Sequence, residues 1–240
     1  MESKKVKIAA LSDIHIKEDS SGLFQEVFAS ISQNADVLVL GGDLTDHGLP
    51  TQAHLLAKEF TFCRIPIVGV LGNHDYESGK QEEVKKILTE GGMKLLEDGP
   101  VEIEGIGFAG VKGFGGGFDN HMLGSFGEKT LKDFVQETIN EALHLETSLG
   151  QLKTKHKVVV MHYSPLVATC IGEPPEIFPF LGSSRLSEPI NRFEASVVFH
   201  GHAHFGSPEG KTMKKIPVYN VAYPLMQKLS PDKPYKVIEL

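Results

Sequence analysis

Three short apolar segments near the start of the chain alternate with stretches of helical spacing. Segments 8–11, 37–40 and 67–71 are rich in leucine and β-branched residues and end at polar turns, which is typical of strands buried on both faces. Over 22–33 and 52–62, apolar residues recur every three or four positions, as in amphipathic helices. Because a strand–helix–strand order brings parallel strands into one sheet by right-handed crossovers, the sequence predicts an α/β fold.

The remainder of the chain continues this pattern without a linker. We expect helices over 80–91 and 129–149, and several short strands between 93 and 112 that turn at Gly105. Later apolar segments are each expected to form a strand: 158–161, 197–199, 218–221 and 237–240. No internal repeat or low-complexity tract interrupts the sequence, so residues 1–240 are predicted to form a single domain.

The charge of the chain narrows the classes of function. The formal net charge is −7, and the only arginines are Arg64, Arg185 and Arg192. Proteins that bind nucleic acids broadly use many Lys and Arg side chains to neutralise phosphates. We therefore expect no nucleic-acid partner, and a phosphate ligand would need positive charge from another source.

Membrane and secretory features are not expected from this sequence. The apolar segments are far too short to span a bilayer, and 8–11 is too brief for the apolar core of a secretory signal. Only two cysteines occur, Cys63 and Cys170, without CxxC spacing, which predicts unlinked thiols in a reducing compartment. We expect a cytoplasmic protein without a membrane partner.

Two loops have compositions that are often found in binding sites. Residues 113–117, Gly-Phe-Gly-Gly-Gly, lack the GxxxxGK[ST] order of a phosphate-binding loop, so the pattern favours a mobile loop. Residues 173–179 are proline-rich and are expected to form a surface loop. Whether the loops over 113–121 and 173–183 border a site stays open from the sequence.

Polar side chains stand at the ends of five expected strands. In chain order these endings read Ser12-Asp13-Ile14-His15, Gly41-Gly42-Asp43, Gly72-Asn73-His74-Asp75, His162, and Gly201-His202-Ala203-His204. In open α/β sheets, ligands bind outside the carboxyl ends of the strands. Parallel strands would bring all five endings to one edge.

Each ending alone is a weak signal. A lone histidine after a strand is more often a hydrogen-bonded structural residue than a ligand, and Gly-Asp is a common turn. The Gly-His-x-His ending is rarer, because residues i and i+2 of an extended chain point to the same side. The five endings together, in this order, form a specific pattern.

Other polar residues near these motifs fit structural roles better. His200 fits a position within a strand, and Asp46 fits a turn or a helix cap. Weaker candidates for reaching a substrate follow the glycine-rich loop and the fourth strand ending: Asn120, His121, Tyr163 and Ser164.

The motifs DxH, GD, GNHD, H and GHxH, in this order, resemble those of the calcineurin-like metallophosphoesterases, and every motif position is filled. The motif region runs from Asp13 to His204, which is most of the chain. The resemblance implies a two-sheet sandwich flanked by helices (α/β/β/α), with a binuclear metal centre at the strand ends. Residues 42–46 and the short chain look most like the branch that contains the class III cyclic-nucleotide phosphodiesterases.

The resemblance also implies a role for each residue of the centre. One metal ion would be held by Asp13, His15 and His204, and the other by Asn73, His162 and His202. Asp43 would bridge the two ions. His74 would assist phosphate binding and leaving-group protonation, and Asp75 would orient His74 by a hydrogen bond.

The donor types support such a centre independently of the resemblance. A carboxylate can give one oxygen to each of two cations, as expected of Asp43. Nitrogen and oxygen donors without a thiolate suit Mn, Fe or Zn, with manganese preferred, and fit Mg or Ca poorly. Two divalent ions outweigh the charges of Asp13 and Asp43, which would let an arginine-poor pocket bind phosphate. A hydroxide bridging the ions is expected to attack phosphorus in line.

The expected function is therefore metal-dependent hydrolysis of a small phosphoester, preferably a phosphodiester. Phosphomonoesterase or protein phosphatase activity is the first alternative, although no separate peptide-docking segment is visible. A DNA nuclease conflicts with the acidic charge. A non-catalytic scaffold would tolerate loss of ligands or of His74, and none of these residues is missing.

Overall fold

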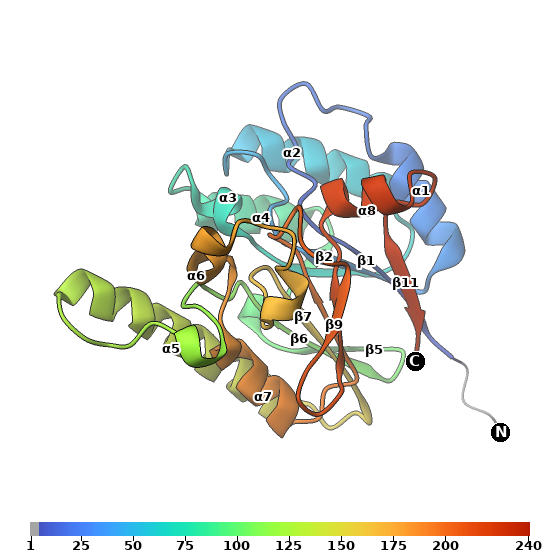
Figure 1. Ribbon diagram of the computed structural model, residues 1–240. Helices are drawn as coiled ribbons and strands as arrows, with labels where there is room; N and C mark the ends of the chain where they lie inside the picture. Colours follow the sequence, from blue (N-terminus) through green and yellow to red (C-terminus); the bar gives the residue numbers. More distant parts are fainter. Residues whose placement is uncertain (1–4) are drawn as a thin grey trace.

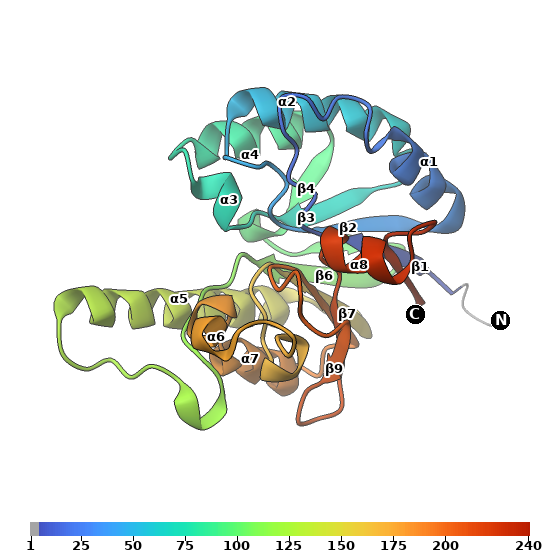
Figure 2. The same cartoon turned by 45° about the horizontal axis from the view of Figure 1, so that its top comes forward.

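The computed structural model describes residues 5–240, and two β-sheets lie face to face at its centre (Figure 1). Helices cover the outer face of each sheet, so the molecule has four layers (Figure 2). This α/β/β/α sandwich confirms the predicted fold class. Within residues 5–240, no helix is both long and apolar enough to cross a membrane.

The first sheet has the strand order β11-β1-β2-β3-β4. Four parallel strands are flanked at one edge by an antiparallel strand: β1 (Lys7–Leu11), β2 (Val37–Gly41), β3 (Ile67–Val70), β4 (Met93–Leu95) and, antiparallel to β1, β11 (Lys236–Glu239). The helices that accompany this sheet are α1 (Gln25–Asn34), α2 (Pro50–Glu59), α3 (Asn73–Tyr76), α4 (Gln81–Glu90) and α8 (Tyr223–Leu229).

The second sheet has the strand order β5-β6-β7-β8-β10-β9. Its four central strands are parallel and its two edge strands antiparallel: β6 (Ile106–Val111), β7 (His156–Met161), β8 (Val197–His200) and β10 (Pro217–Asn220), with β5 (Val101–Ile103) and β9 (Glu209–Lys211) at the edges. Its outer face carries α5 (Lys129–Gln151), α6 (Phe178–Leu181) and α7 (Ser187–Arg192) (Figure 2).

Alternation along each strand explains the four layers. On β1, Ile8 faces the second sheet, whereas Ala9 packs toward the helices of its own sheet. On β7, Val158 and Val160 face the first sheet, whereas Val159 packs toward α5. Successive side chains of a strand point to opposite faces, so a strand that is apolar throughout must be covered on both sides. Each fully buried Val, Ile or Leu contributes about 1.5–3 kcal/mol.

The fold differs from the sequence prediction mainly at edges and boundaries. The expected helix over 52–62 ends as a 3-10 turn, Phe60–Phe62, after α2. The predicted turn at Gly105 is confirmed: Glu104 and Gly105 both have positive φ and close the β5–β6 hairpin. The expected surface loop over 173–179 contains a 3-10 turn, Pro175–Ile177, and the start of α6.

Candidate metal centre

The carboxyl ends of the parallel strands of both sheets meet at one edge of the sandwich, which we call the rim. The ends of β1, β2 and β3 come from the first sheet, and those of β7 and β8 from the second. The residues of the predicted centre follow these ends and fall into two adjoining groups: Asp13, His15, Asp43, Asn73, His162, His202 and His204.

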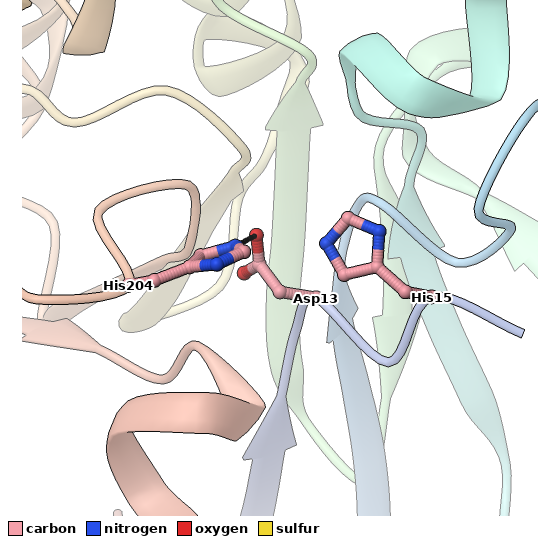
Figure 3. A group of neighbouring side chains, drawn as sticks. All are labelled: Asp13, His15 and His204. Carbon is pink, nitrogen blue, oxygen red and sulfur yellow. Dashed lines mark hydrogen bonds and ion pairs between the residues drawn. The ribbon is translucent and has the colours of Figure 1, made fainter.

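The first group consists of Asp13, His15 and His204. One ligand atom from each lies within 4.8 Å of the others. Nε2 of His204 is 3.0 Å from Oδ1 of Asp13. His15 and His204 lie on opposite sides of Asp13 (Figure 3). The group therefore presents two imidazoles and one carboxylate, drawn from the ends of β1 and β8.

The second group consists of Asp43, His162 and His202, whose ligand atoms also lie within 4.8 Å of one another. Nε2 of His162 is 3.1 Å from Nδ1 of His202 and 2.9 Å from Oδ1 of Asn73. Asn73 thus joins this group through its amide oxygen. The donors are two imidazoles, one carboxylate and one amide, without a thiolate.

Asp43 lies at the border between the two groups. Its Oδ2 atom is 3.8 Å from Nε2 of His15 in the first group and 3.4 Å from Nε2 of His162 in the second. Its Oδ1 atom accepts a hydrogen bond of 2.8 Å from the backbone N–H of His74. A single oxygen of Asp43, rather than one oxygen for each group, therefore faces both sets of ligands.

Backbone contacts interlock the motifs. Both carboxylate oxygens of Asp13 are 3.0 Å from the backbone N of His202, which donates to them. A Cβ on Gly201 would lie 2.0 Å from Oδ2 of Asp13, and one on Gly72 would lie 2.2 Å from Oδ1 of Asp43. Real Cβ atoms do not approach other atoms so closely, so glycine is required before the ligands at both places.

Four residues of the centre have backbone conformations that residues other than glycine rarely adopt. The φ angle is 56° at Asp13, 43° at His15, 48° at Asp43 and 68° at His202. Such conformations cost on the order of 1–3 kcal/mol each and cluster at functional sites. The surrounding fold, rather than local preference, must therefore hold these residues in place.

Carbonyl groups fix the orientation of both histidines in the second group. Nδ1–H of His162 donates to the Gly41 carbonyl at 3.0 Å, and Nε2–H of His202 donates to the Phe180 carbonyl at 3.1 Å. In the neutral form of each ring, the other nitrogen then carries the lone pair. Those two nitrogens, Nε2 of His162 and Nδ1 of His202, are the ones that face each other in the group.

His15 shows that the residues fit a metal ion. Both of its ring nitrogens are buried and have no hydrogen-bond partner among residues 5–240. A buried polar atom without a partner costs about 1–3 kcal/mol, so native structures rarely contain one unexplained. Coordination of an ion by Nε2, which points toward Asp43, would supply a partner.

Electrostatics couples the two groups. Burial alone would raise the pKa of Asp13, but the hydrogen bond from His204 and the charge of His162 lower it well below its usual range. Burial would lower the pKa of His162, but the nearby charge of Asp43 raises it to about 9. Burial, together with the charge of His162, lowers the pKa of His202 to about 4. Without metal, the centre therefore balances buried carboxylates with a protonated His162.

The His74 ring stands beside the first group, with its centroid 4.6 Å from that of His15. Its Nδ1–H donates to the backbone carbonyl of Asp46 at 2.6 Å. The sequence predicted that Asp75 would orient this ring, which is wrong. Asp75 turns inward instead, because four donors from three neighbouring residues surround its carboxylate: the backbone N–H groups of Gly72, Leu44 and Thr45 and the hydroxyl of Thr45.

Asp75 therefore supports the centre indirectly. It is fully buried and ties the turn after β2 to the turn after β3, which carry Asp43 and Asn73. Burial and the charge of Asp43 raise the pKa of Asp75 to about 6. Its four donors all favour the ionised form, so we take Asp75 as a carboxylate at neutral pH.

Two of the remaining candidates, His200 and Tyr163, have partners of their own beside the centre. His200 is buried at the end of β8, where its Nε2 lies 2.8 Å from Oγ1 of Thr169, in agreement with its predicted strand position. The ring of Tyr163 packs on His202 with 4.4 Å between centroids. Cys63 and Cys170 are free thiols, as predicted.

The sequence motifs missed three backbone carbonyls that orient histidines of the centre: those of Gly41, Asp46 and Phe180. A backbone carbonyl has no signature in the residue type that carries it, so no motif could have marked these positions. Phe180 shows in addition that the loop over 173–183 borders the site, which the sequence left open.

Comparisons with known proteins agree with this geometry. The family model described as calcineurin-like phosphoesterase matches residues 6–206. No curated protein sequence matches the chain. Among solved structures, phosphopantetheinyl hydrolase from Mycobacterium tuberculosis has a TM-score of 0.71 at 15% identity, covering 98% of this chain and 96% of the other.

Two further structures share the fold over a smaller part of their own length. The anchor in the inner membrane complex of Plasmodium has a TM-score of 0.56 at 14% identity, covering 92% of this chain and 72% of the other. A purple acid phosphatase from yellow lupin seeds has a TM-score of 0.54 at 12% identity, covering 85% and 38%. Since the family model spans most of the sequence, the chain belongs to the calcineurin-like phosphoesterase family.

Proposed function

We propose that the protein is a hydrolase that uses two metal ions to cleave a phosphoester, with a small phosphodiester as its substrate. The observation that carries this proposal is the position of Asp43, whose Oδ2 atom faces a histidine of each ligand group. Membership of the phosphoesterase family supports the same reaction class.

The two groups would hold one ion each, with Asp43 shared between them. The first ion would be bound by Asp13, His15 and His204, and the second by Asn73, His162 and His202. Nitrogen and oxygen donors without a thiolate suit Mn, Fe or Zn, and we propose manganese among these. Two such ions lower the pKa of a water molecule and neutralise phosphate oxygens.

His74 is the residue of this chain best placed to handle a proton. Its Nδ1 is engaged by the Asp46 carbonyl, so Nε2 is the position at which a proton can be exchanged. The side chain is 37% exposed and packs against His15. We propose that a His74 ring carrying both protons donates the Nε2 proton to the leaving oxygen of the ester and is left as the neutral ring with Nδ1–H.

The test is a panel of phosphoesters assayed with Mn²⁺. We expect the protein to cleave bis-p-nitrophenyl phosphate faster than p-nitrophenyl phosphate. Faster cleavage of the monoester would favour a phosphomonoesterase or a protein phosphatase, and the purple acid phosphatase among the structural neighbours makes this the first alternative.

The His74→Ala variant separates chemistry from metal binding. We expect its turnover to fall at least 100-fold while two metal ions per chain remain bound. Loss of turnover together with loss of bound metal would make His74 a metal ligand. A non-catalytic scaffold is the alternative suggested by the Plasmodium anchor protein, and a chain that retains no stoichiometric metal and cleaves no ester would support it.

A further inference from the structure

A pocket of about 260 Å³ lies between the glycine-rich loop and the segment that contains α6. We call it the side pocket. Its apolar walls are Phe118, Val167, Pro175, Phe178 and Pro179. Gly117 and two polar residues, Asp119 and His121, complete it. Both polar residues are exposed, so they place the mouth of the pocket at the surface.

The walls of the side pocket are directly connected to the metal centre. Phe178 and Pro179 precede Phe180, whose carbonyl accepts the hydrogen bond from Nε2 of His202. Phe178 and Val167 also pack in one cluster with Ala203, the residue between His202 and His204. The pocket walls therefore belong to one packed cluster with the residue that lies between two of the seven ligands.

Backbone hydrogen bonds hold the two loops together, so the side pocket is preformed. The N–H of Gly117 donates to the Gly182 carbonyl at 2.9 Å, and that of Ser183 donates to the Ser164 carbonyl at 3.0 Å. A Cβ on Gly182 would lie 1.9 Å from the Ser164 carbonyl oxygen, so only glycine allows this approach. The segment with α6 is thereby fixed between the glycine-rich loop and the turn after His162.

The chemistry of the walls favours an apolar group over an anionic one. Five walls are apolar side chains, and an anionic group would meet the Asp119 carboxylate at the mouth. Asp119 is itself tied to Ser184, whose Oγ lies 2.9 Å from its backbone N and 3.3 Å from its Oδ1. An apolar cavity of about 150 Å³ accommodates benzene, so a pocket of about 260 Å³ has room for a one-ring or two-ring aromatic group.

We propose that the side pocket binds an uncharged aromatic or branched aliphatic substituent of the phosphoester whose phosphate lies at the metal centre. This inference rests on the proposed function and extends it to a substrate class. The arginine-poor rim would recognise the phosphate through the metal ions, whereas the side pocket would recognise the organic group.

Phosphonates with a phenyl group at the end of an alkyl chain test this arrangement, because they bind without being cleaved. We expect affinity for the Mn²⁺-loaded protein, measured by calorimetry, to reach a maximum at one linker length. At that length binding should be at least about tenfold tighter than that of methylphosphonate, because burial of the ring adds to the phosphonate contact. If no member of the series binds more tightly than methylphosphonate, the proposal is wrong.

Two variants show whether the gain comes from the side pocket. Val167→Trp fills it from a wall, and His121→Trp covers its mouth from an exposed position, where folding is not at risk. Both should abolish the tenfold gain, and His121→Trp should leave the affinity for methylphosphonate unchanged. The control is Leu229→Trp on α8, where the side chain is 55% exposed and lies outside the pocket.

A gain that survives in both folded pocket variants, or disappears equally in the control, would overturn the proposal. The natural chain has no tryptophan, so each variant carries a single fluorophore. We expect the phenyl probe to change the emission of the tryptophan at 167 or 121 and not of that at 229. The protein could bind two metal ions and methylphosphonate but gain no affinity from the phenyl ring. That result would leave the proposed function intact and would show that the side pocket has no part in substrate binding.

Discussion

The two ligand groups of the rim differ in how many of their histidine ring nitrogens are held by hydrogen bonds from the protein. In the second group, His162 is fully buried and its ring is held by the Gly41 carbonyl, while His202 is held by the Phe180 carbonyl. In the first group, the side chain of His15 is 16% exposed, and neither of its ring nitrogens has a hydrogen-bond partner among residues 5–240. The protein thus prepares one group by hydrogen bonds and leaves the other incomplete.

This difference predicts an order of metal binding. Ligands already oriented by hydrogen bonds lose less freedom when an ion binds, so the second group should take up metal more tightly. The first group gains the most from an ion, because coordination also gives His15 a partner. The following predictions, from the largest effect to the smallest, test this contrast.

Removal of the charge of Asp43 should affect both groups at once. In Asp43→Asn, an amide oxygen can still accept the hydrogen bond from the backbone of His74, so the loop geometry is retained. We expect metal content to fall below one ion per chain and turnover to fall by on the order of 10³-fold or more. Elemental analysis gives the metal content. Two ions retained per chain would show that Asp43 is not shared.

In the metal-free protein, replacing one histidine of each group should lower the free energy of unfolding by different amounts. His162→Ala leaves the buried Asp43 carboxylate without its ion-pair partner, so we expect the free energy of unfolding to fall by about 3 kcal/mol. His15→Ala removes two ring nitrogens that have no hydrogen-bond partner among residues 5–240, and it should change that free energy by less than about 1 kcal/mol. Urea unfolding with a chelator present measures both. Equal losses would contradict the contrast.

Proton release should accompany metal binding to the second group. The pKa of His162 is raised from 6.5 to about 9 in the metal-free protein, so the ring is charged at neutral pH. An ion must displace that proton, and calorimetry at pH 7.5 in buffers of different ionisation enthalpy should show about one proton released. In His162→Gln the released proton should disappear.

The same pKa shift has a consequence for stability. A pKa that is higher in the folded state means that the protonated ring stabilises the fold. For the metal-free protein, this contribution is complete below pH 6.5 and is lost as the pH rises through about 9. Constant stability across that interval would argue against a buried charged His162.

The smallest expected effect concerns Asp46, whose Oδ1 lies 3.5 Å from Nδ1 of His15. Asp46→Asn should weaken metal binding by the first group by about tenfold and leave the second group unchanged. The matched control is Glu77→Gln, because Glu77 lies 3.7 Å from the His74 ring and has no contact with His15. Equal weakening of both groups would contradict this assignment.

The sequence predicted the rim well because its residues follow strands that are apolar on both faces. Asp13, Asp43 and His162 each stand directly after or near such a strand, and parallel pairing then brings them together. The edge strand β9 was not predicted, because such a short, half-exposed segment lacks a clear apolar period. Asp75 was assigned to His74 although burial gave it nearer donors.

The positive φ angles at Asp13, His15, Asp43 and His202 have a consequence for sequence drift within the family. Glycine adopts these conformations without strain, so replacement of a ligand by glycine relieves a cost that alanine would keep. A descendant that no longer needs metal would therefore gain thermal stability if glycine replaced the ligands at these four positions. Melting temperatures of the glycine and alanine variants at each position, measured without metal, can be compared directly. Their difference gives the stability lost to the strained backbone of the metal centre.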